Sequence, residues 1–297
     1  MKKAVRLMIL AVLCAALLCG CVMNFHTSSG RSDFLYDNAE SYTMGGASLT
    51  DAVEKVEVEW LSGSVLVTTH PGDTVEFEES ANRRLNDDNT LYYRLEGTTL
   101  HIKFCRSGKW DFSGLAKDLT LRLPESLTLT ELEVDSVSAE VAADAVSAAE
   151  LKLNTVSGAI LVTDCEVTEK AQLGSVSGEI GAGLQGSLKK LNAGSVSGSV
   201  SVSAGEIDSL ETETTSGSIS VSVGTAPREL EVDTVSGSVK LYLPEDAGFT
   251  LRFSTVSGSF VSDLPCKADG KRYVCGSGAG DYSVETTSGS LRIRAAE

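Results

Sequence analysis

Hydrophobic and polar residues alternate along most of the chain, in short runs that are interrupted by a recurring Ser-Gly pair. Around Gly237, Leu230 and Val232 lie seven and five positions before the glycine. Val239 and Leu241 lie two and four positions after it. Alternation with a period of two indicates strands that bury one face. Each repeat of this pattern therefore predicts two short strands joined at a corner.

The corner glycines repeat about every twenty residues. Successive spacings from Gly158 to Gly258 are 19 to 21 residues, and Ala139 stands in the same place one step earlier. A fixed period of this length is typical of a stacked repeat protein. We expect glycine at the corner because a tight bend often needs positive φ, which glycine adopts at least cost. The predicted corners are Gly63, Gly158, Gly178, Gly198, Gly217, Gly237, Gly258 and Gly289.

One repeat cannot bury its own apolar face, whereas stacked repeats bury a continuous interior. The sequence therefore predicts an all-β fold, a parallel β-solenoid of about 20-residue coils with Ser-Gly corners that rises about 4.8 Å per coil. A β-sandwich is the alternative fold, but its strands and loops vary in length. Here the same hydroxyl residues recur at the same place in each repeat, and these columns indicate structural ladders. One column is Thr155, Ser175, Ser195, Thr214, Thr234, Thr255 and Thr286; the other is Ser157, Ser177, Ser197, Ser216, Ser236, Ser257 and Ser288.

The solenoid domain is predicted over residues 51–297. Within it, the spacing of about twenty residues is lost over 68–131, although strand-like runs persist. We interpret this stretch as irregular coils that cap the N-terminal side. The residues between 259 and 286 are interpreted as an insertion into the last interval. Arg292 and Arg294 alternate with Leu291 and Ile293, so we expect a charged outer strand that discourages further pairing at an exposed edge.

Residues 1–20 have the pattern of a lipoprotein signal peptide, with Lys2, Lys3 and Arg6 before an apolar stretch. The run Leu18-Cys19-Gly20-Cys21 resembles a bacterial lipobox, which makes Cys21 the candidate for lipidation, although Cys19 departs from the usual motif. Residues 21–50 are then a lipidated N-terminus and tether. An ordinary secretory signal is the alternative. An uncleaved anchor is less favoured, because the apolar run is shorter than the ~20 residues that span a bilayer.

Removal of the three basic residues of the leader would change the net charge from −16 to −19. Strong acidity argues against nucleic acid and against charge-driven docking on anionic lipid, both of which need basic patches. Export permits disulfides. Cys266 and Cys275 bracket a predicted hairpin turn and form the candidate bridge, whereas Cys105 and Cys165 are expected to be buried thiols.

The chain shows no pattern typical of catalysis, of a metal site or of a cofactor site. Its three histidines lie in no metal-ligand spacing, and a serine that recurs in every repeat is not the single activated serine of a hydrolase. Some β-helical enzymes cleave acidic polysaccharides with clustered charges. Here only Glu213 and Asp233 are expected on adjacent coils in their outward column, and a solvated pair is the simpler interpretation. Ice or glycan binding by a hydroxyl array, as at Thr212 and Thr214, is a further alternative to structural ladders.

Three runs and the repeated Thr-Val-Ser-Gly-Ser-Val resemble the bacterial DUF4097 family, described as adhesins with β-strand repeats. The resemblance covers about residues 47–294; the runs are Val56 to Val67, Leu119 to Pro124 and Leu241 to Glu245. It implies envelope attachment and names no catalytic residues. We therefore expect a non-catalytic, lipid-anchored protein on the extracytoplasmic side of the membrane or at the cell surface, acting as an adhesin or interaction module for an unknown protein or glycan. The alternative is an envelope scaffold or stress-response component that acts on a membrane partner.

Overall fold

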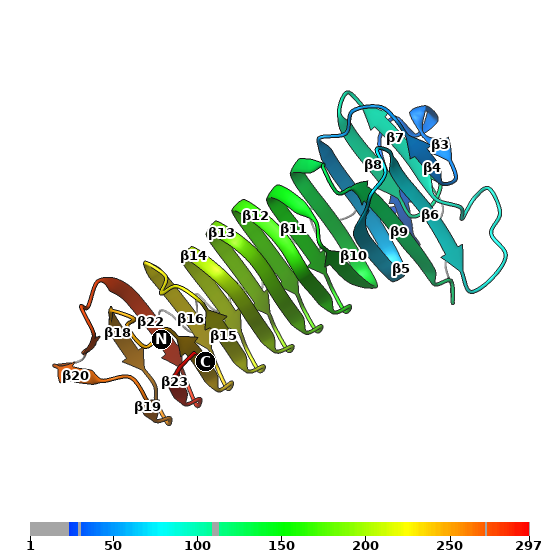
Figure 1. The fold of residues 1–297 in the computed structure, drawn as a ribbon. Coiled ribbons are helices and arrows are strands. Elements are labelled where there is room, and N and C mark those ends of the chain that lie inside the picture. Colours follow the sequence, from blue (N-terminus) through cyan, green and yellow to red (C-terminus); the bar gives the residue numbers. More distant parts are fainter. Residues whose placement is uncertain (1–23, 29–30, 109–112, 271, 297) are drawn as a thin grey trace.

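The computed structural model describes residues 24–28, 31–108, 113–270 and 272–296, and most of them form a rod of stacked strands (Figure 1). Its centre is parallel and in register, so that Leu173 lies beside Ala193 and Ser175 beside Ser195. The inward rows are buried, as the alternation predicts. The predicted β-solenoid is confirmed. Its central strands are β10 (Thr128–Asp144), β11 (Ser147–Thr155), β12 (Ile160–Ser175), β13 (Ile180–Ser195), β14 (Val200–Thr214), β15 (Ile219–Val223), β16 (Glu229–Thr234) and β17 (Val239–Leu243).

Buried hydroxyl groups connect successive coils at the Ser-Gly corners. Ser195 Oγ accepts a hydrogen bond from the backbone N–H of Gly198 at 2.9 Å, and it donates to the carbonyl of Gly178 in the preceding coil at 3.0 Å. Thr214 repeats both contacts one coil further on. This column is a structural ladder, as predicted. The second column, from Ser157 onward, lies at the solvent-exposed tip of the corners.

The corner glycines are required for a reason that differs from our expectation. Among the predicted corners only Gly63 has a positive φ, of 101°. At Gly178 and Gly198, a Cβ atom would lie 1.7 Å and 1.9 Å from the carbonyl oxygen of the corner in the preceding coil. No real Cβ approaches an oxygen so closely. The corner therefore excludes a side chain because adjacent coils touch through their backbones, and left-handed backbone is not the cause.

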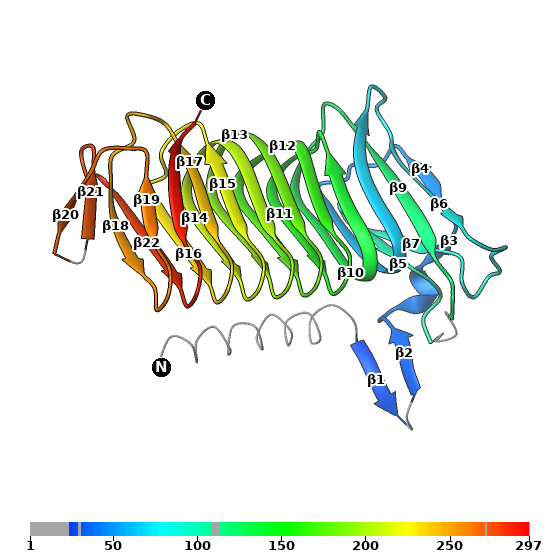
Figure 2. The same cartoon turned by 90° about the horizontal axis from the view of Figure 1, so that it is seen from below.

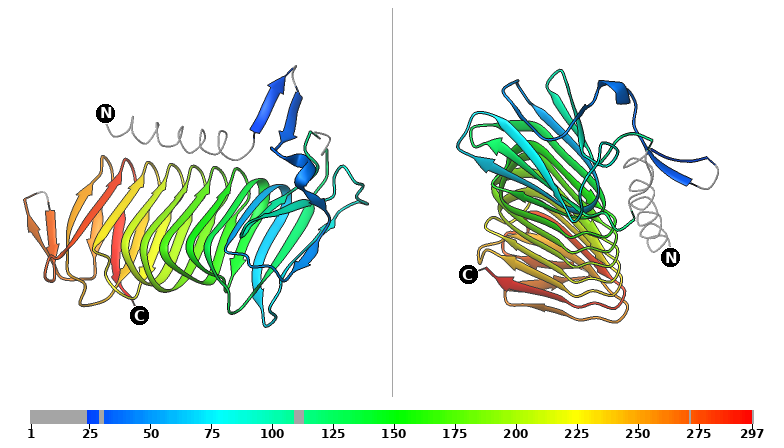
Figure 3. Two further views of the ribbon diagram at one scale, coloured as in Figure 1. Left: turned by 90° about the horizontal axis from the view of Figure 1, so that it is seen from above. Right: turned by 90° about the vertical axis from the view of Figure 1, so that its right-hand side faces the viewer.

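The N-terminal end is a mixed sheet, in which parallel pairing like that of the coils continues and antiparallel strands are added. Strand β5 (Lys55–His70) pairs in parallel with β10, β8 (Thr99–Lys103) and β9 (Lys117–Pro124). In contrast, β6 (Val75–Ala81) is antiparallel to β9, and β7 (Tyr92–Glu96) is antiparallel to β8. The turn at Gly97, with φ of 61°, closes the hairpin of β7 and β8. Viewed from this end, the coils lie one behind another (Figure 3).

A buried lysine closes the interior at this end. Lys117 is fully buried beneath the corner of Gly63, and its Nζ atom lies 2.6 Å from Glu79 and over the ring of Trp60 at 4.8 Å. The indole N–H of Trp60 donates to the carbonyl of Lys117 at 2.9 Å. Burial lowers the pKa of Lys117, and Glu79 opposes that shift. The pair is thus a desolvated ion pair that sits where the next coil would continue the core.

The predicted tether is wrong for its second half, because those residues belong to the folded cap. Phe34 is buried, and the hydroxyl of Tyr36 donates to the carbonyl of Cys105 at 3.1 Å. A short 3-10 helix, Ala39–Ser41, leads to β3 (Thr43–Met44) and β4 (Ala47–Leu49), which pair with β7 and β6. Strands β1 (Asn24–Ser28) and β2 (Arg31–Leu35) form a separate two-stranded sheet (Figure 2).

At the C-terminal end the coils do not stack in the order of the sequence. The last coil, β22 (Gly280–Thr286) and β23 (Leu291–Ala295), lies between β16 and β17 on one side and β18 (Phe249–Ser254) and β19 (Phe260–Ser262) on the other. A Cβ at Gly289 would meet Gly237, and one at Gly258 would meet Gly289. Arg292 and Arg294 are therefore in an interior strand, and the expectation that they protect an outer edge is wrong.

The inserted segment is shorter than the sequence indicates, because β19 and β22 belong to regular coils. It is a hairpin of β20 (Cys266–Asp269) and β21 (Arg272–Cys275), closed by a disulfide between Cys266 and Cys275 whose Cα atoms are 4.2 Å apart. Strand β21 is antiparallel to β18 over Phe249 to Leu251. The ring of Tyr273 packs on Phe260 with 4.5 Å between centroids, so the hairpin covers the open end of the core.

Candidate interaction surface

One side of the rod carries three outward rows of mostly charged or polar side chains. It consists of the strands that lead into each corner, where inward residues fill the core and the residues between them face solvent. Toward the C-terminal end, Glu211, Glu231, Ser283 and Arg252 form one row across β14, β16, β22 and β18. We call these strands, with their outward residues, the charged face.

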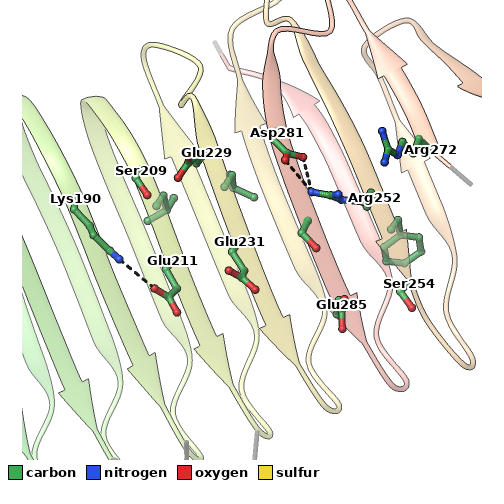
Figure 4. Close-up of a pocket in the computed structure, with 14 residues that line it drawn as sticks. Lys190, Ser209, Glu211, Glu229, Glu231, Arg252, Ser254, Arg272, Asp281 and Glu285 are labelled. Carbon is green, nitrogen blue, oxygen red and sulfur yellow. Dashed lines mark hydrogen bonds and ion pairs between the residues drawn. The ribbon is translucent and has the colours of Figure 1, made fainter. Parts of the chain in front are cut away.

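The charged face is hollowed into a groove of about 710 Å³ near the C-terminal end. Figure 4 shows acidic side chains projecting from neighbouring strands along it, with basic groups at both ends. Lys190 Nζ lies 3.6 Å from Glu211. Arg252 donates to both carboxylate oxygens of Asp281 at 2.8 Å. The groove thus offers an acidic middle, and two of the basic groups at its ends, Lys190 and Arg252, already have acidic partners.

Glu213 is a carboxylate near the groove whose ionisation this face disfavours. Burial, followed by the like charges of Glu211, Asp233 and Glu231, raises its pKa to about 7. Its side chain folds over Gly194, where a Cβ would lie 3.0 Å from Glu213 Cγ. A nearby positive charge would stabilise the ionised form. The local electrostatics therefore favour a ligand that carries basic groups.

Glu213 belongs to a second outward row, four positions before the corner glycines. The order of the coils places three carboxylates next to one another in this row. Asp233 pairs with Glu285 and not with Ser254, because the last coil is interposed. The row thus reads Glu213, Asp233, Glu285, and the expectation of only two adjacent acids is wrong. The sequence contains the signal, since Glu285 lies four positions before its glycine, but sequence order alone places it one coil too far away.

The N-terminal half of the charged face has its charges largely matched. Lys55 Nζ lies 2.8 Å from Glu57 and 2.9 Å from Glu131, and His101 Nδ1 lies 2.9 Å from Glu57. The hydrogen bond from His101, with help from Lys55, lowers the pKa of Glu57 to about 2. Burial instead raises the pKa of Asp135 to about 7, although Asn154 donates a hydrogen bond to it. More of the charged groups in this half are paired with one another than in the groove.

The strands on the other side of the corners present a smoother surface. Over β12 to β15 their outward positions are small or uncharged apart from Glu179 at the margin, and Leu161 is 49% exposed. The remaining outward positions are Ala159, Thr163, Gly181, Gly183, Ser199, Ser201, Ser203, Ser218, Ser220 and Ser222. Over β12 to β15 the rod therefore separates charged from uncharged side chains onto different faces.

Comparison with known families accounts for this architecture. The family model "Toastrack DUF4097" matches residues 53–294. The chain belongs to this family. The match covers the strands from β5 to the interposed last coil, so nearly the whole rod belongs to the Toastrack domain.

The solved structures that are similar to this chain are distant in sequence. A "putative lipid binding protein" from Parabacteroides distasonis is 14% identical and aligns with a TM-score of 0.47 over 86% of this chain and 97% of its own. A "putative adhesin" from Bacteroides fragilis is 13% identical, with a TM-score of 0.41 over 85% and 96%. A "putative cell adhesion protein" from Clostridium sporogenes is 13% identical, with a TM-score of 0.29 over 85% and 99%. Among curated protein sequences no relative matches.

The residues singled out from sequence fall in different parts of the Toastrack chain. Cys21 lies outside the described residues. Cys266 and Cys275 are joined at the C-terminal end, and Cys105 and Cys165 are free and buried. Thr212, proposed as part of a hydroxyl array, is buried and so is not presented to solvent. In the described part of the chain there is no cluster of three or more metal-ligating side chains, and no helix is long and apolar enough to cross a membrane.

Proposed function

We propose that this Toastrack protein is a lipid-anchored, non-catalytic interaction module that uses its charged face to bind a partner at the cell surface, as an adhesin does. The observation that supports this most directly is the 710 Å³ groove. Long faces built from many coils are well suited to extended binding surfaces. The partner that fits this groove is a protein or glycan that presents basic groups to the acidic middle.

The anchor in this proposal is a diacylglycerol on Cys21, with the chain before it removed. Two or more acyl chains hold a protein stably on a membrane. We expect the wild-type protein to partition with membranes and Cys21→Ser to be released. Mass spectrometry of the mature N-terminus should detect the lipid on the wild-type chain. An unmodified N-terminus on the membrane-associated protein would contradict the anchor and leave the groove hypothesis to its own test.

The binding role is tested by substitutions that change charge without touching the core. The double variant Glu211→Gln with Glu231→Gln removes two groove carboxylates, and Ser201→Ala with Ser220→Ala is the matched control on the uncharged face. Crosslinking on intact cells, followed by mass spectrometry, identifies partners of each variant. We expect the groove variant to lose its partner at an unchanged unfolding temperature, and the control to retain it. Equal capture by both variants would contradict recognition by this face.

The same experiment distinguishes the alternative role. Extracellular proteins, matrix glycans or molecules of foreign cells among the captured partners would support adhesion. Membrane sensors or wall enzymes of the same cell would instead support an envelope scaffold or stress-response component. In either case, loss of partner capture in the variant that lacks the Glu211 and Glu231 carboxylates would show that the partner binds at the groove.

A further inference from the structure

The outermost coil at the C-terminal end leaves part of its edge without a neighbour. In the described part of the chain, β19 pairs only with β23. The hairpin of β20 and β21 projects beside β18, whereas β19 lies near the Ser-Gly corner (Figure 1). Among the described residues, no strand is therefore stacked on the outer edge of β19.

The backbone groups on this edge can be assigned from the pairing. Leu291 N–H donates to the carbonyl of Ser259 at 2.9 Å, and Asp263 N–H donates to that of Ile293 at 3.0 Å. Residues of a strand direct their backbone groups alternately to its two neighbours. The N–H and C=O groups of Phe260 and Ser262 therefore point away from the rod. At the equivalent place in an interior coil, Ile219 N–H donates to Ser238 in the following coil at 3.0 Å.

Apolar side chains accompany this open edge. Val256 is 83% exposed and Val261 is 44% exposed. Val156 and Val176, which occupy the place of Val256 in interior coils, are partly buried and pack against the core. Val256 is exposed because no further coil covers it, whereas Val261 lies in an outward row that is also exposed in the interior coils, as at Leu161. An unpaired strand edge beside exposed apolar groups is a template for another strand.

We propose that this edge binds a second copy of the chain, by antiparallel pairing of the two β19 strands about a two-fold axis at Val261. Phe260 would exchange backbone hydrogen bonds with Ser262 of the partner subunit, and the reciprocal pair would form on the other side. The two Val261 side chains would meet between these pairs, where opposite residues come within about 4.5 Å. A copy of the chain fits because an isologous contact needs the same free edge on both partners, and because the pairing continues the edge-to-edge contact that joins every coil of the rod.

The position of this edge gives the pairing a consequence for adhesion, which rests on the function proposed above. The cap formed by residues 34–50 is at one end of the rod and β19 is at the other (Figure 2). Two copies paired through β19 would hold their N-terminal ends apart, so that molecules on facing surfaces would join end to end. Each contact is short, and many weak contacts acting together give strong attachment.

A cysteine at the two-fold axis tests the pairing directly in the full chain. Mild oxidation of Val261→Cys should give a disulfide-linked dimer, because opposed residues at this spacing satisfy disulfide geometry. Leu161→Cys is the matched control, an exposed apolar position in the same outward row of an interior coil. We expect several-fold more dimer from Val261→Cys than from Leu161→Cys. Equal yields would overturn the proposal, as would a Val261→Cys chain that crosslinks only to other proteins in the cell.

Charge at the same position tests the consequence for adhesion. Beads that carry the full chain through its N-terminus should cluster, and Val261→Lys should weaken dimerisation at least tenfold in sedimentation and abolish clustering. Leu161→Lys should do neither, and both variants should retain the wild-type unfolding temperature. Clustering that survives Val261→Lys would overturn pairing through β19. Because Glu211→Gln with Glu231→Gln leaves this edge intact, loss of groove binding and loss of pairing are separate results.

Discussion

The physical demands on single residues are most stringent at the corners, where successive coils meet backbone to backbone. The glycine there has no room for a methyl group, and the hydroxyl three positions earlier satisfies two buried backbone groups at once. These two demands explain why small residue types recur with the repeat. They also allow substitutions that separate steric fit from hydrogen bonding.

Gly198→Ala should destabilise the fold strongly. Its Cβ would lie 1.9 Å from the carbonyl of Gly178, so the coils must separate, and we expect a loss of about 1–3 kcal/mol or more in the free energy of unfolding. Gly181→Ala is the control, because its nearest neighbour is a flexible Leu161 methyl at 3.2 Å. Chemical denaturation should show a change below about 1 kcal/mol for the control. Similar losses at both positions would contradict the role of the close approach.

Thr214→Val tests the hydroxyl ladder at constant side-chain volume. It removes the acceptor for Gly217 N–H and the donor to Gly198, both of which are buried. Leaving such groups unsatisfied costs about 1–3 kcal/mol. Thr214→Ser keeps the hydroxyl and should retain most of the stability in the same denaturation experiment. A serine variant as unstable as the valine variant would show that the methyl group and not the hydroxyl matters.

Glu213→Gln should change how stability depends on pH. The folded pKa of Glu213 is raised from 4.5 to about 7, so the folded state binds a proton that the unfolded state has released between these values. The free energy of unfolding should therefore fall as pH rises through this window, and the glutamine variant should lack that contribution. Near pH 8 we expect the variant to be more stable than the wild type by on the order of 1 kcal/mol, after allowance for solvent screening. Equal pH profiles would contradict the raised pKa.

At the scale of elements, the two ends of the rod are closed by different means. A buried Lys117–Glu79 pair and antiparallel strands close the N-terminal end, whereas a disulfide-bonded hairpin covers the C-terminal core. Neither element follows the twenty-residue repeat. Both place polar or aromatic groups where a further coil would otherwise be required to cover apolar side chains.

Replacing Cys266 and Cys275 by serine should loosen this C-terminal cover. Loss of a bridge around so short a loop costs about 2–3 kcal/mol by the chain-entropy model. Because Tyr273 then packs less firmly on Phe260, hydrogen exchange should accelerate in β18 and β21 and stay unchanged in β12 to β14. Uniform acceleration along the rod would show that the hairpin stabilises the whole domain and is not a local cover.

At the scale of the whole molecule, each coil of the rod contacts and stabilises only the coils next to it. Hydrogen exchange at low protein concentration should therefore be slowest in the middle, at Ile180 and Ile219, and fast at Phe260 and Ser262 on the open edge. Raising the concentration should slow Phe260 and Ser262 selectively if copies pair through β19. Exchange that is fast in the middle and slow at the edge would contradict this account of the stack.

The residues by themselves determined the repeated part of the fold. Alternation, period and the hydroxyl column predicted parallel coils, their inward rows and their Ser-Gly corners, because every coil meets the same local environment and so selects the same residue type. The paired cysteines and the turn between them likewise indicated the hairpin. Lipidation of Cys21 stays a prediction from the sequence.

Only the tertiary structure decided the order of the final coils, the folded state of residues 34–50 and the cause of the corner glycines. A repeat unit specifies which face it buries, but coils of the same pattern can stack in more than one order. Contacts between distant segments, such as Glu285 beside Asp233 or β3 beside β7, leave no periodic signal. The groove and the open β19 edge depend on that order, so both emerge from the fold and not from any motif.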